Sequence, residues 1–509
     1  MNLVIGSGPA GVSLAMALIA RGQSVTLLDG GQTLSPGLVD KRDALAARSP
    51  EDWDRKEIAD WQAPQLTNSS DLAMRYGSTH AQNPADQLLD PADTFSGRSS
   101  LAVGGLSKVW GAAVLPYRQS DIEDWPIDAS ALAPHYQAVS GFMPIAGKID
   151  GLQDLFPAFD ADALSPLAVG PQGATLLERL SQNRARLEAS GVHFGAARQA
   201  VRADCKLCGQ CLHGCPWSMI YAADQTLRDL QKSERFTYHP GAIVSGVSET
   251  DGEAHVHLAD GMQLSADRVF VAAGVYETAR LILNSADTSD ATLTLQDSRQ
   301  FFLPMLHRWG TNTDPNEMPL HTLAKAFVEI DHADVSPYLT HSQIYSWNAF
   351  FAREMMENYG HKLPGSQALF SAIAKRLMVA QTFIHSDHCD SVVLRLNQNT
   401  HRLHTHVIEN EEMIPTIERA ASTLSKAMRR AGLYALGFAK RIEGPGASFH
   451  TGGTLPMSKT PKTLQTNPLG LLNGFERIHV VDASVLPSIP ASTITFTVMA
   501  NAHRIGSLV

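Results

Sequence analysis

The sequence predicts an α/β protein, α+β overall, in which a Rossmann-type dinucleotide-binding domain is joined to a second domain built on an antiparallel sheet. A strand–turn–helix–strand pattern opens the chain at residues 3–29, and a second strand–helix pattern follows at 269–283. Alternating stretches rich in aromatic residues and histidines lie between residues 287 and 440. The chain has 509 residues, which exceeds the ~250–300 at which one core stops growing, so two lobes are expected.

The first strand leads into the motif Gly6-x-Gly8-x-x-Gly11. In a nucleotide site the first glycine permits the tight turn, the second lets the backbone approach a pyrophosphate, and the third lets helix and strand pack closely. Asp29 ends the second strand, where a carboxylate can accept hydrogen bonds from a ribose. The alternative to a dinucleotide site is a glycine-rich turn in a strand-to-helix unit that binds no nucleotide. The residues predicted to contact the nucleotide here are Gly6, Ser7, Gly8, Pro9, Ala10, Gly11 and Asp29.

The net charge of −10 argues against binding to nucleic acid or to an anionic membrane. Residues 483–502 carry no charge, but Pro487 and Pro490 argue against a membrane span, so this segment is expected to be buried core. The first strand begins at residue 3 and leaves no room for a signal peptide, which predicts a cytoplasmic protein.

After Asp29, residues 30–85 are polar and irregular and form a predicted excursion, with helices near 40–47 and 51–61. Residues 103–116 follow as a glycine-rich turn and a small-residue segment, which implies that a flat ligand or another backbone lies close by. Residues 124–136 predict a turn that enters a helix.

These motifs together resemble the glucose–methanol–choline (GMC) oxidoreductase family. The resemblance rests on the N-terminal glycines, on Gly104-Gly105 with Ser107 and Trp110, and on Trp125-Pro-Ile127. It implies FAD as the cofactor, with Gly105, Ser107 and Trp110 near it. Lys108 and Val109 stand where some related oxidases carry a flavin-linking histidine, so non-covalent FAD is expected.

The chain is divided accordingly into three expected segments: an FAD-binding domain at 1–286, a substrate domain at 287–440, and a return to the FAD-binding domain at 441–509. The first segment includes the excursion and a cysteine loop at 203–217.

Four of the five cysteines lie in the run Cys205-x-x-Cys208-x-x-Cys211-x-x-x-Cys215-Pro. This spacing is typical of a [4Fe–4S] cluster. The fourth ligand is Cys215 or, as an alternative, the remote Cys389. Two other interpretations remain open: a structural zinc site, although zinc usually spaces its cysteine pairs further apart, or a loop that holds no metal.

Further along, a helix is expected at 221–232 and strands at 235–246, 254–258 and 268–273, with a hairpin turn at Asp260-Gly261. The family resemblance places Val244 beside the adenine and puts Ala273 and Gly274 in the second nucleotide-binding turn. For the substrate domain, the sequence predicts strands at 301–307, 324–330, 342–350, 382–387 and 391–396, and helices at 365–376 and 414–431. Histidine pairs here, such as His404 and His406, complete no metal-ligand set and fit polar strand faces lining a pocket.

The C-terminal segment resembles the family's signature, with Ser448-Phe-His450 followed by Asp482-Ala483. The resemblance makes His450 the active-site histidine and places Asp482 and Ala483 at the flavin. Where the family carries a second His or Asn, this chain has Thr493 as the nearest match. Its hydroxyl can orient an alcohol but cannot act as a base near neutral pH, so proton transfer would rest on His450.

The expected function is therefore a FAD-dependent dehydrogenase that oxidises the CH–OH group of an alcohol or a sugar-like compound. An iron–sulfur cluster would pass electrons to an acceptor protein or a quinone. Two alternatives stay open: a redox-neutral or light-driven flavin enzyme, such as a decarboxylase or isomerase, and an electron-transfer flavoprotein with a degenerate alcohol site.

Overall fold

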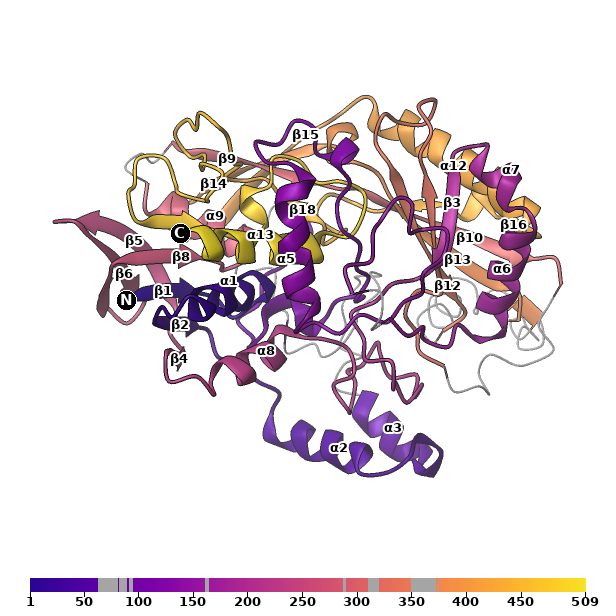
Figure 1. The fold of residues 1–509 in the computed structure, drawn as a ribbon, viewed down its shortest axis with the longest axis horizontal. Helices are drawn as coiled ribbons and strands as arrows, with labels where there is room; N and C mark the ends of the chain where they lie inside the picture. Colours follow the sequence, from indigo (N-terminus) through magenta and orange to yellow (C-terminus); the bar gives the residue numbers. More distant parts are fainter. Residues whose placement is uncertain are drawn as a thin grey trace.

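The computed structural model describes residues 1–62, 81, 89–90, 95–160, 164–286, 290–309, 320–348, 372–373 and 375–509. The described chain forms four sheets flanked by helices, which confirms the predicted mixture of α/β and antiparallel parts. In Figure 1 the parallel sheet lies on the left with both termini, and the largest antiparallel sheet lies on the right.

The nucleotide-side sheet has five parallel strands drawn from three distant parts of the chain. Apolar, almost fully buried residues such as Leu3, Leu27 and Phe270 form its centre, as expected of a sheet that is covered on both faces. In spatial order the strands are β19 (Ile478–Val480), β8 (Arg268–Val271), β1 (Asn2–Ile5), β2 (Val25–Asp29) and β4 (Phe236–Pro240).

Helices from both ends of the chain pack around this sheet. The last helix lies against the first, and the helix at 129–140 packs on the last one in turn. A three-stranded antiparallel sheet adjoins through the helix that follows β8. The helices are α1 (Pro9–Ala20), α5 (Ala129–Ser140), α8 (Ala223–Leu230), α9 (Val275–Asn284) and α13 (Ile494–Leu508), and the added strands are β5 (Val244–Thr250), β6 (Glu253–Leu258) and β7 (Gln263–Ala266).

The second large sheet is antiparallel and has two different faces. One face is apolar and packs on helices α6 (Gly170–Gln182), α7 (Arg184–Glu188) and α12 (Met413–Arg430). The opposite face carries Gln343, Tyr345, Gln381 and Phe383, which line a cavity. In order the strands are β16 (Leu433–Ala435), β10 (Gln300–His307), β13 (Leu377–Phe383), β12 (Thr340–Ser346), β11 (Ala326–Ile330) and β3 (Val192–Ala196), and β17 (Arg441–Ile442) pairs with β10.

A smaller antiparallel sheet connects the two large ones. Its strands are β15 (Leu403–Ile408), β14 (Ser391–Leu396), β9 (Thr292–Asp297) and β18 (Thr451–Gly452). Single 3₁₀ turns are η1 (Pro50–Asp52), η4 (Gly105–Lys108), η5 (Gln119–Asp121), η8 (Ser386–His388), η9 (Gly437–Ala439) and η10 (Ala483–Val485).

Several predicted elements differ from the observed ones. The strand predicted at 382–387 is the end of β13, which stops at Phe383 and is followed by the 3₁₀ turn η8. The single strand predicted at 235–246 is two strands, β4 and β5, because the chain turns at Gly241, which has a φ of 79°. The strand β3 pairs with β11 of the second sheet, although it precedes residue 287. The helix predicted at 365–376 lies almost entirely outside the described residues.

The predicted excursion contains two helices, α2 (Pro36–Ala46) and α3 (Arg55–Gln62), which project from the body below α8 in Figure 1. They pack on the cysteine loop: Trp53 stacks on Trp217 with ring centroids 5.3 Å apart, and the Trp217 Nε1–H donates to the Ala46 carbonyl at 2.9 Å. This contact fixes the position of the helices against residues 205–217.

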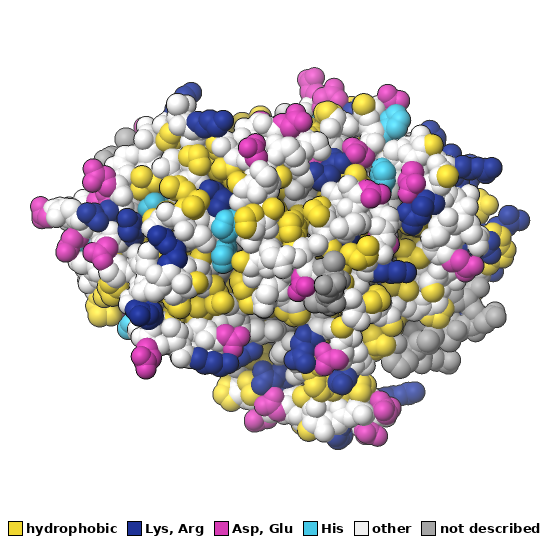
Figure 2. Space-filling model, viewed as in Figure 1, with side chains coloured by type: hydrophobic (Ala, Val, Ile, Leu, Met, Phe, Trp, Pro, Cys, Tyr) yellow, Lys and Arg dark blue, Asp and Glu magenta, His cyan; other side chains and the backbone are white. Residues whose placement is uncertain are grey.

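The uncharged segment 483–502 is buried core, and it passes into helix α13. No described helix is both long enough and apolar enough to cross a bilayer. Figure 2 shows acidic and basic side chains interspersed over the visible face.

Candidate active site

The predicted nucleotide-binding residues surround one cavity of about 180 Å³ at the carboxyl ends of the parallel strands β1, β2 and β8. This edge of a parallel sheet is where ligands bind in open α/β folds. The predicted residues that line the cavity are Gly6, Ser7, Gly8, Pro9, Ala10, Asp29, Gly105, Ala273, Gly274, Asp482 and Ala483.

Two of the glycines are required by close backbone contacts. A Cβ on Gly6 would lie 2.4 Å from the Ala272 carbonyl oxygen, and a Cβ on Gly11 would lie 2.0 Å from the Gly6 oxygen. Gly11 thus packs behind the turn and does not line the cavity. Gly8 differs, because a Cβ there would meet no atom within 4 Å. The space over Gly8, at the N-terminus of α1, is where an incoming pyrophosphate would lie.

Two buried carboxylates brace the walls of this cavity. Asp29 accepts hydrogen bonds from the backbone N–H of Ser7 at 2.9 Å and of Gly31 at 2.8 Å. Asp482 accepts from the Gly274 N–H at 2.9 Å and from the Thr278 hydroxyl at 2.6 Å. These bonds hold the two glycine turns, and burial raises the pKa of Asp482.

A second cavity, also of about 180 Å³, lies between the nucleotide cavity and the polar face of the seven-stranded sheet. The two cavities share five wall residues: Pro9, Leu106, Phe449, Ile494 and Thr495. The predicted residues His450, Thr493, Ser107 and Trp110 all line the second cavity. The structure therefore brings the predicted catalytic pair together beside the predicted cofactor site.

His450 precedes β18, and its partly buried ring stacks on Phe383 with centroids 4.4 Å apart. Its Nδ1 atom is buried and has no hydrogen-bond partner among the described residues, and the residue lines the cavity. Burial, with a further effect of the nearby His341, lowers the pKa of His450 to about 3. The imidazole is therefore neutral at physiological pH and can accept a proton.

Because the pKa of His450 is lowered, we expect kcat/KM to stay constant as the pH falls below neutral. Because His450 stays neutral above about pH 3, its protonation should not reduce kcat/KM between pH 8 and pH 5. A histidine with an ordinary pKa near 6.5 would lose about 30-fold over the same range. Initial rates with FAD-saturated enzyme measure the profile, and a decline of one decade per pH unit below 6.5 would contradict the lowered pKa.

Thr493 is the N-cap residue of α13 and is 2% exposed. Its hydroxyl oxygen accepts a hydrogen bond from the Leu115 backbone N–H at 2.7 Å. The hydroxyl proton remains to be donated, so Thr493 can offer one hydrogen bond to an oxygen atom in the cavity.

Val244, another residue predicted to contact the cofactor, lies away from the nucleotide cavity. Val244 begins β5 and is buried, but it does not line the nucleotide cavity. Conversely, the polar wall made by Gln343 and Gln381 was not singled out by sequence analysis. Both glutamines stand on strands that alternate polar and apolar residues, and that alternation indicated only that one strand face is polar.

The cysteine loop lies apart from both cavities and has an unusual backbone. Leu207, Gly209, Gly214 and Ser218 adopt positive φ values of 54°, 75°, 104° and 52°. Such left-handed residues fold the loop tightly, and for Leu207 and Ser218 they carry a conformational cost.

Several sulfur atoms in this loop accept backbone hydrogen bonds. The Cys215 Sγ accepts from the Met219 N–H at 3.3 Å, and Cys205 and Cys208 accept from Leu207 and Gln210 respectively. Burial raises the pKa of the Cys205 thiol to about 11 and that of Cys215 above its usual value. Within the described ranges, no three His, Cys, Asp or Glu side chains are grouped closely enough to hold one metal ion.

Cys389, the alternative fourth ligand, lies in the core of the second sheet. Its sulfur accepts the Arg299 N–H at 3.2 Å and contacts the His385 carbonyl at 3.3 Å. The charged groups that affect its pKa are Asp297, Arg299 and Asp390, none of them in the cysteine loop. The remote thiolate is thus not brought to the other four cysteines.

Comparison with known proteins agrees with this geometry. Residues 386–502 match a family model described as GMC oxidoreductase. The crystal structure of pyridoxine 4-oxidase from Mesorbium loti is similar over 99% of this chain and 98% of that chain, with a TM-score of 0.61 and 16% sequence identity. At this identity the likeness shows the fold. No curated protein sequence matches the chain.

The matched segment includes His450, Asp482 and Thr493, which are the residues that the C-terminal resemblance depends on. The structural match extends the likeness to the nucleotide-binding half. Residues 386–502 therefore match the GMC oxidoreductase model, and the chain as a whole shares the fold of the pyridoxine 4-oxidase structure.

Proposed function

We propose that the protein is a FAD-dependent dehydrogenase that oxidises the CH–OH group of an alcohol or sugar-like compound. The observation that carries the proposal is a neutral imidazole, that of His450, in a cavity that shares a wall with the nucleotide cavity. A base in that position can take the hydroxyl proton of an alcohol while the hydrogen on carbon leaves toward the cofactor.

The residues of the nucleotide cavity fit FAD. The open space over Gly8 and the N-terminus of α1 suit a pyrophosphate, and Asp29 stands at the end of β2. When bound, FAD supplies the two-electron acceptor for the hydrogen that leaves the substrate carbon. Gly8 would allow its close approach, and Lys108 and Val109 offer no imidazole for a covalent link.

The chain's own residues supply binding and proton transfer. His450 accepts the substrate hydroxyl proton at Nε2, and the Thr493 hydroxyl donates a hydrogen bond that orients the same oxygen. Phe383 stacks on the His450 ring and limits its rotation. Gln343 and Gln381 present amide groups from the opposite wall, which suits a substrate with further hydroxyl groups.

The proposal is tested by mixing FAD-loaded protein with a panel of alcohols under nitrogen and following the flavin absorption. Sugars, aliphatic alcohols and pyridoxine belong in the panel, the last because the structural neighbour is a pyridoxine 4-oxidase. Bleaching by one class of alcohol, with stoichiometric carbonyl product, supports the proposal. Product without bleaching, or no reaction with any alcohol, would contradict it.

Thr493 offers a test of substrate orientation. Thr493→Val keeps the shape but removes the hydroxyl, so kcat/KM for the alcohol should fall about tenfold, the value of one hydrogen bond. Thr493→Ser keeps the hydroxyl and should retain most of the activity. The Val variant also leaves the Leu115 N–H unpaired, so its thermal midpoint is measured to separate a loss of stability from a loss of rate. Equal kcat/KM for both variants would show that the hydroxyl is not used.

The cysteine loop is proposed to hold a [4Fe–4S] cluster through Cys205, Cys208, Cys211 and Cys215. The sequence spacing and the backbone N–H groups directed at sulfur support this assignment. The four thiols are not grouped around one point in the described chain, so they would have to close around the cluster. Such a cluster passes single electrons, which favours a dehydrogenase that delivers electrons to an acceptor protein or quinone over an oxidase. Efficient peroxide formation with substrate in air would contradict that preference.

Metal analysis tests the cluster. Anaerobically purified protein should contain about four iron and four sulfide per chain, and Cys208→Ser should lose most of both. Cys389→Ser serves as the matched control and should keep them, because Cys389 lies in a different core. Protein that contains zinc in place of iron, or no metal, would exclude the cluster.

A further inference from the structure

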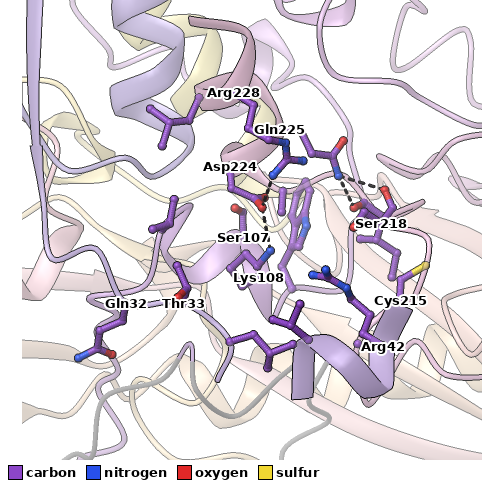
Figure 3. Close-up of a pocket in the computed structure, with 18 of the residues that line it drawn as sticks. Gln32, Thr33, Arg42, Ser107, Lys108, Cys215, Ser218, Asp224, Gln225 and Arg228 are labelled. Carbon is purple, nitrogen blue, oxygen red and sulfur yellow. Dashed lines mark hydrogen bonds and ion pairs between the residues drawn. The ribbon is translucent and has the colours of Figure 1, made fainter. Parts of the chain in front are cut away.

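The largest of the cavities described here, about 430 Å³, is separate from the nucleotide cavity and from the cavity lined by His450 and Thr493, which is called the alcohol cavity below. It lies between α2, the cysteine loop and α8, and Figure 3 shows residues from all three around one space. Its volume lies in the range of small-molecule sites. The proposed mechanism assigns it no role.

This cavity borders the alcohol cavity and the cysteine loop. Ser107 and Trp110 line both this cavity and the alcohol cavity. On the opposite side its wall includes Cys211 and Cys215. A molecule held here therefore lies against the cysteine loop and is separated from the alcohol cavity by the segment that carries Ser107 and Trp110.

The walls combine the aromatic side chains of Trp61, Trp110 and Tyr238 with positive charge. Lys108 and Arg228 share one carboxylate, that of Asp224, at 3.1 Å and 2.9 Å. Arg42 enters from α2, where its ion-pair partner is the exposed Asp43. Lys108, Arg228 and Arg42 therefore outnumber the single carboxylate of Asp224 among the charged wall residues, so the cavity favours a ligand that carries or gains negative charge.

One wall residue has an unused hydrogen-bond donor. The Trp61 side chain is 2% exposed and lines the cavity, and its Nε1–H has no partner among the described residues. A buried donor without an acceptor costs about 1–3 kcal/mol, so such groups usually meet a ligand or a water molecule. A ligand with a carbonyl oxygen at its edge would satisfy it.

We propose that this cavity binds a quinone as the electron acceptor of the enzyme. A quinone is a flat ring with two carbonyl oxygens, which matches an aromatic wall, the Trp61 donor and the surrounding cations. The inference rests on the proposed function and names its acceptor. Each alcohol gives up two electrons and two protons to become a carbonyl compound, and one quinone takes up two electrons and two protons to become the hydroquinone.

The cations also explain why the site would suit the reduction. A quinone becomes negatively charged as it takes up electrons before protons arrive. Arg42, Lys108 and Arg228 stabilise that charge, while Trp61 donates to a ring oxygen. Cys211 and Cys215 of the cysteine loop also form part of its wall.

Binding is tested directly, without the alcohol reaction, by calorimetric titration of oxidised holoenzyme with duroquinone under nitrogen. The ring carbons of duroquinone are fully methylated, so cysteine thiols cannot readily add to them. We expect saturable binding of one quinone per chain. Arg42→Gln should weaken it about tenfold and Trp61→Phe about fivefold, as expected for a charge-assisted and a neutral hydrogen bond.

The matched control for Arg42→Gln is Arg48→Gln, which makes the same charge change just after α2. Arg48 pairs with Glu57 and does not line the cavity, so quinone binding should be unchanged. In turnover, Arg42→Gln should raise KM for duroquinone about tenfold while the anaerobic rate of flavin reduction by alcohol stays the same.

The absence of saturable binding, or equal weakening by Arg42→Gln and Arg48→Gln, would overturn the proposal. If the native protein, Arg42→Gln and Trp61→Phe all bind duroquinone with equal affinity, the quinone binds elsewhere and the proposal is overturned as well. If no alcohol reduces the flavin but duroquinone binds as described, the acceptor site stands and the proposed alcohol oxidation fails. Arg42 is half-buried on α2, so Arg42→Gln keeps the test independent of folding if Trp61→Phe proves unstable.

Discussion

Replacing His450 by alanine is expected to lower kcat by about 10²–10⁴ while FAD remains bound, because the variant loses the base that takes the substrate proton. The imidazole lines the alcohol cavity but not the nucleotide cavity, so its removal should leave the cofactor contacts intact. Stopped-flow measurement of flavin reduction by alcohol gives the rate, and the absorption spectrum gives the bound FAD.

A matched control is His503→Ala. His503 is another partly buried histidine whose pKa is lowered by burial, but it pairs with His135 between α13 and α5 and lines neither cavity. The His503→Ala variant should therefore keep nearly the full kcat of the native protein. If both variants turn over equally well, or if His450→Ala loses FAD together with activity, the assignment of His450 as the base is wrong.

Replacing Gly8 by valine should abolish tight FAD binding without preventing folding. A Cβ on Gly8 meets no protein atom within 4 Å, and the backbone there has φ −65° and ψ 178°, which any residue adopts. The added side chain instead fills the space of the pyrophosphate. We expect the FAD affinity to fall by about 100-fold or more, since the pyrophosphate loses the helix N-terminus.

The control is Gly37→Val in α2, where a Cβ is also free of contacts and no cofactor is expected. Both variants should show the circular dichroism spectrum of the native protein, and only Gly8→Val should elute without yellow colour. A Gly8→Val protein with stoichiometric FAD would show that the pyrophosphate does not pass over this turn.

The nucleotide half was predictable because its constraints are local. Gly6, Gly8 and Gly11 act within one turn, and the strand, helix and strand around them follow directly in sequence. The placement of His450 depended on a different kind of information. Nothing local shows that residue 450 lines one cavity together with Pro9 of α1, and only the family resemblance placed the two together.

The second domain was less predictable because its contacts are non-local. The strand β3 has only five residues, and its pairing with β11 across more than a hundred residues leaves no pattern in the sequence. For the same reason the wall formed by Gln343 and Gln381 was missed. The cavity at Trp61 combines α2, α3, η4, the cysteine loop and α8, five segments that no single motif relates.

The parallel sheet takes its edge strand β19 from residues 478–480, and α13 packs on α1. A chain emerging from the ribosome therefore holds its N-terminal nucleotide turn for nearly the whole of synthesis without the partners that complete it. Asp482, Ala483, Ile494, Thr495 and Val498 also line the nucleotide cavity, so a nucleotide cofactor is expected to bind tightly only after almost the entire chain has been translated.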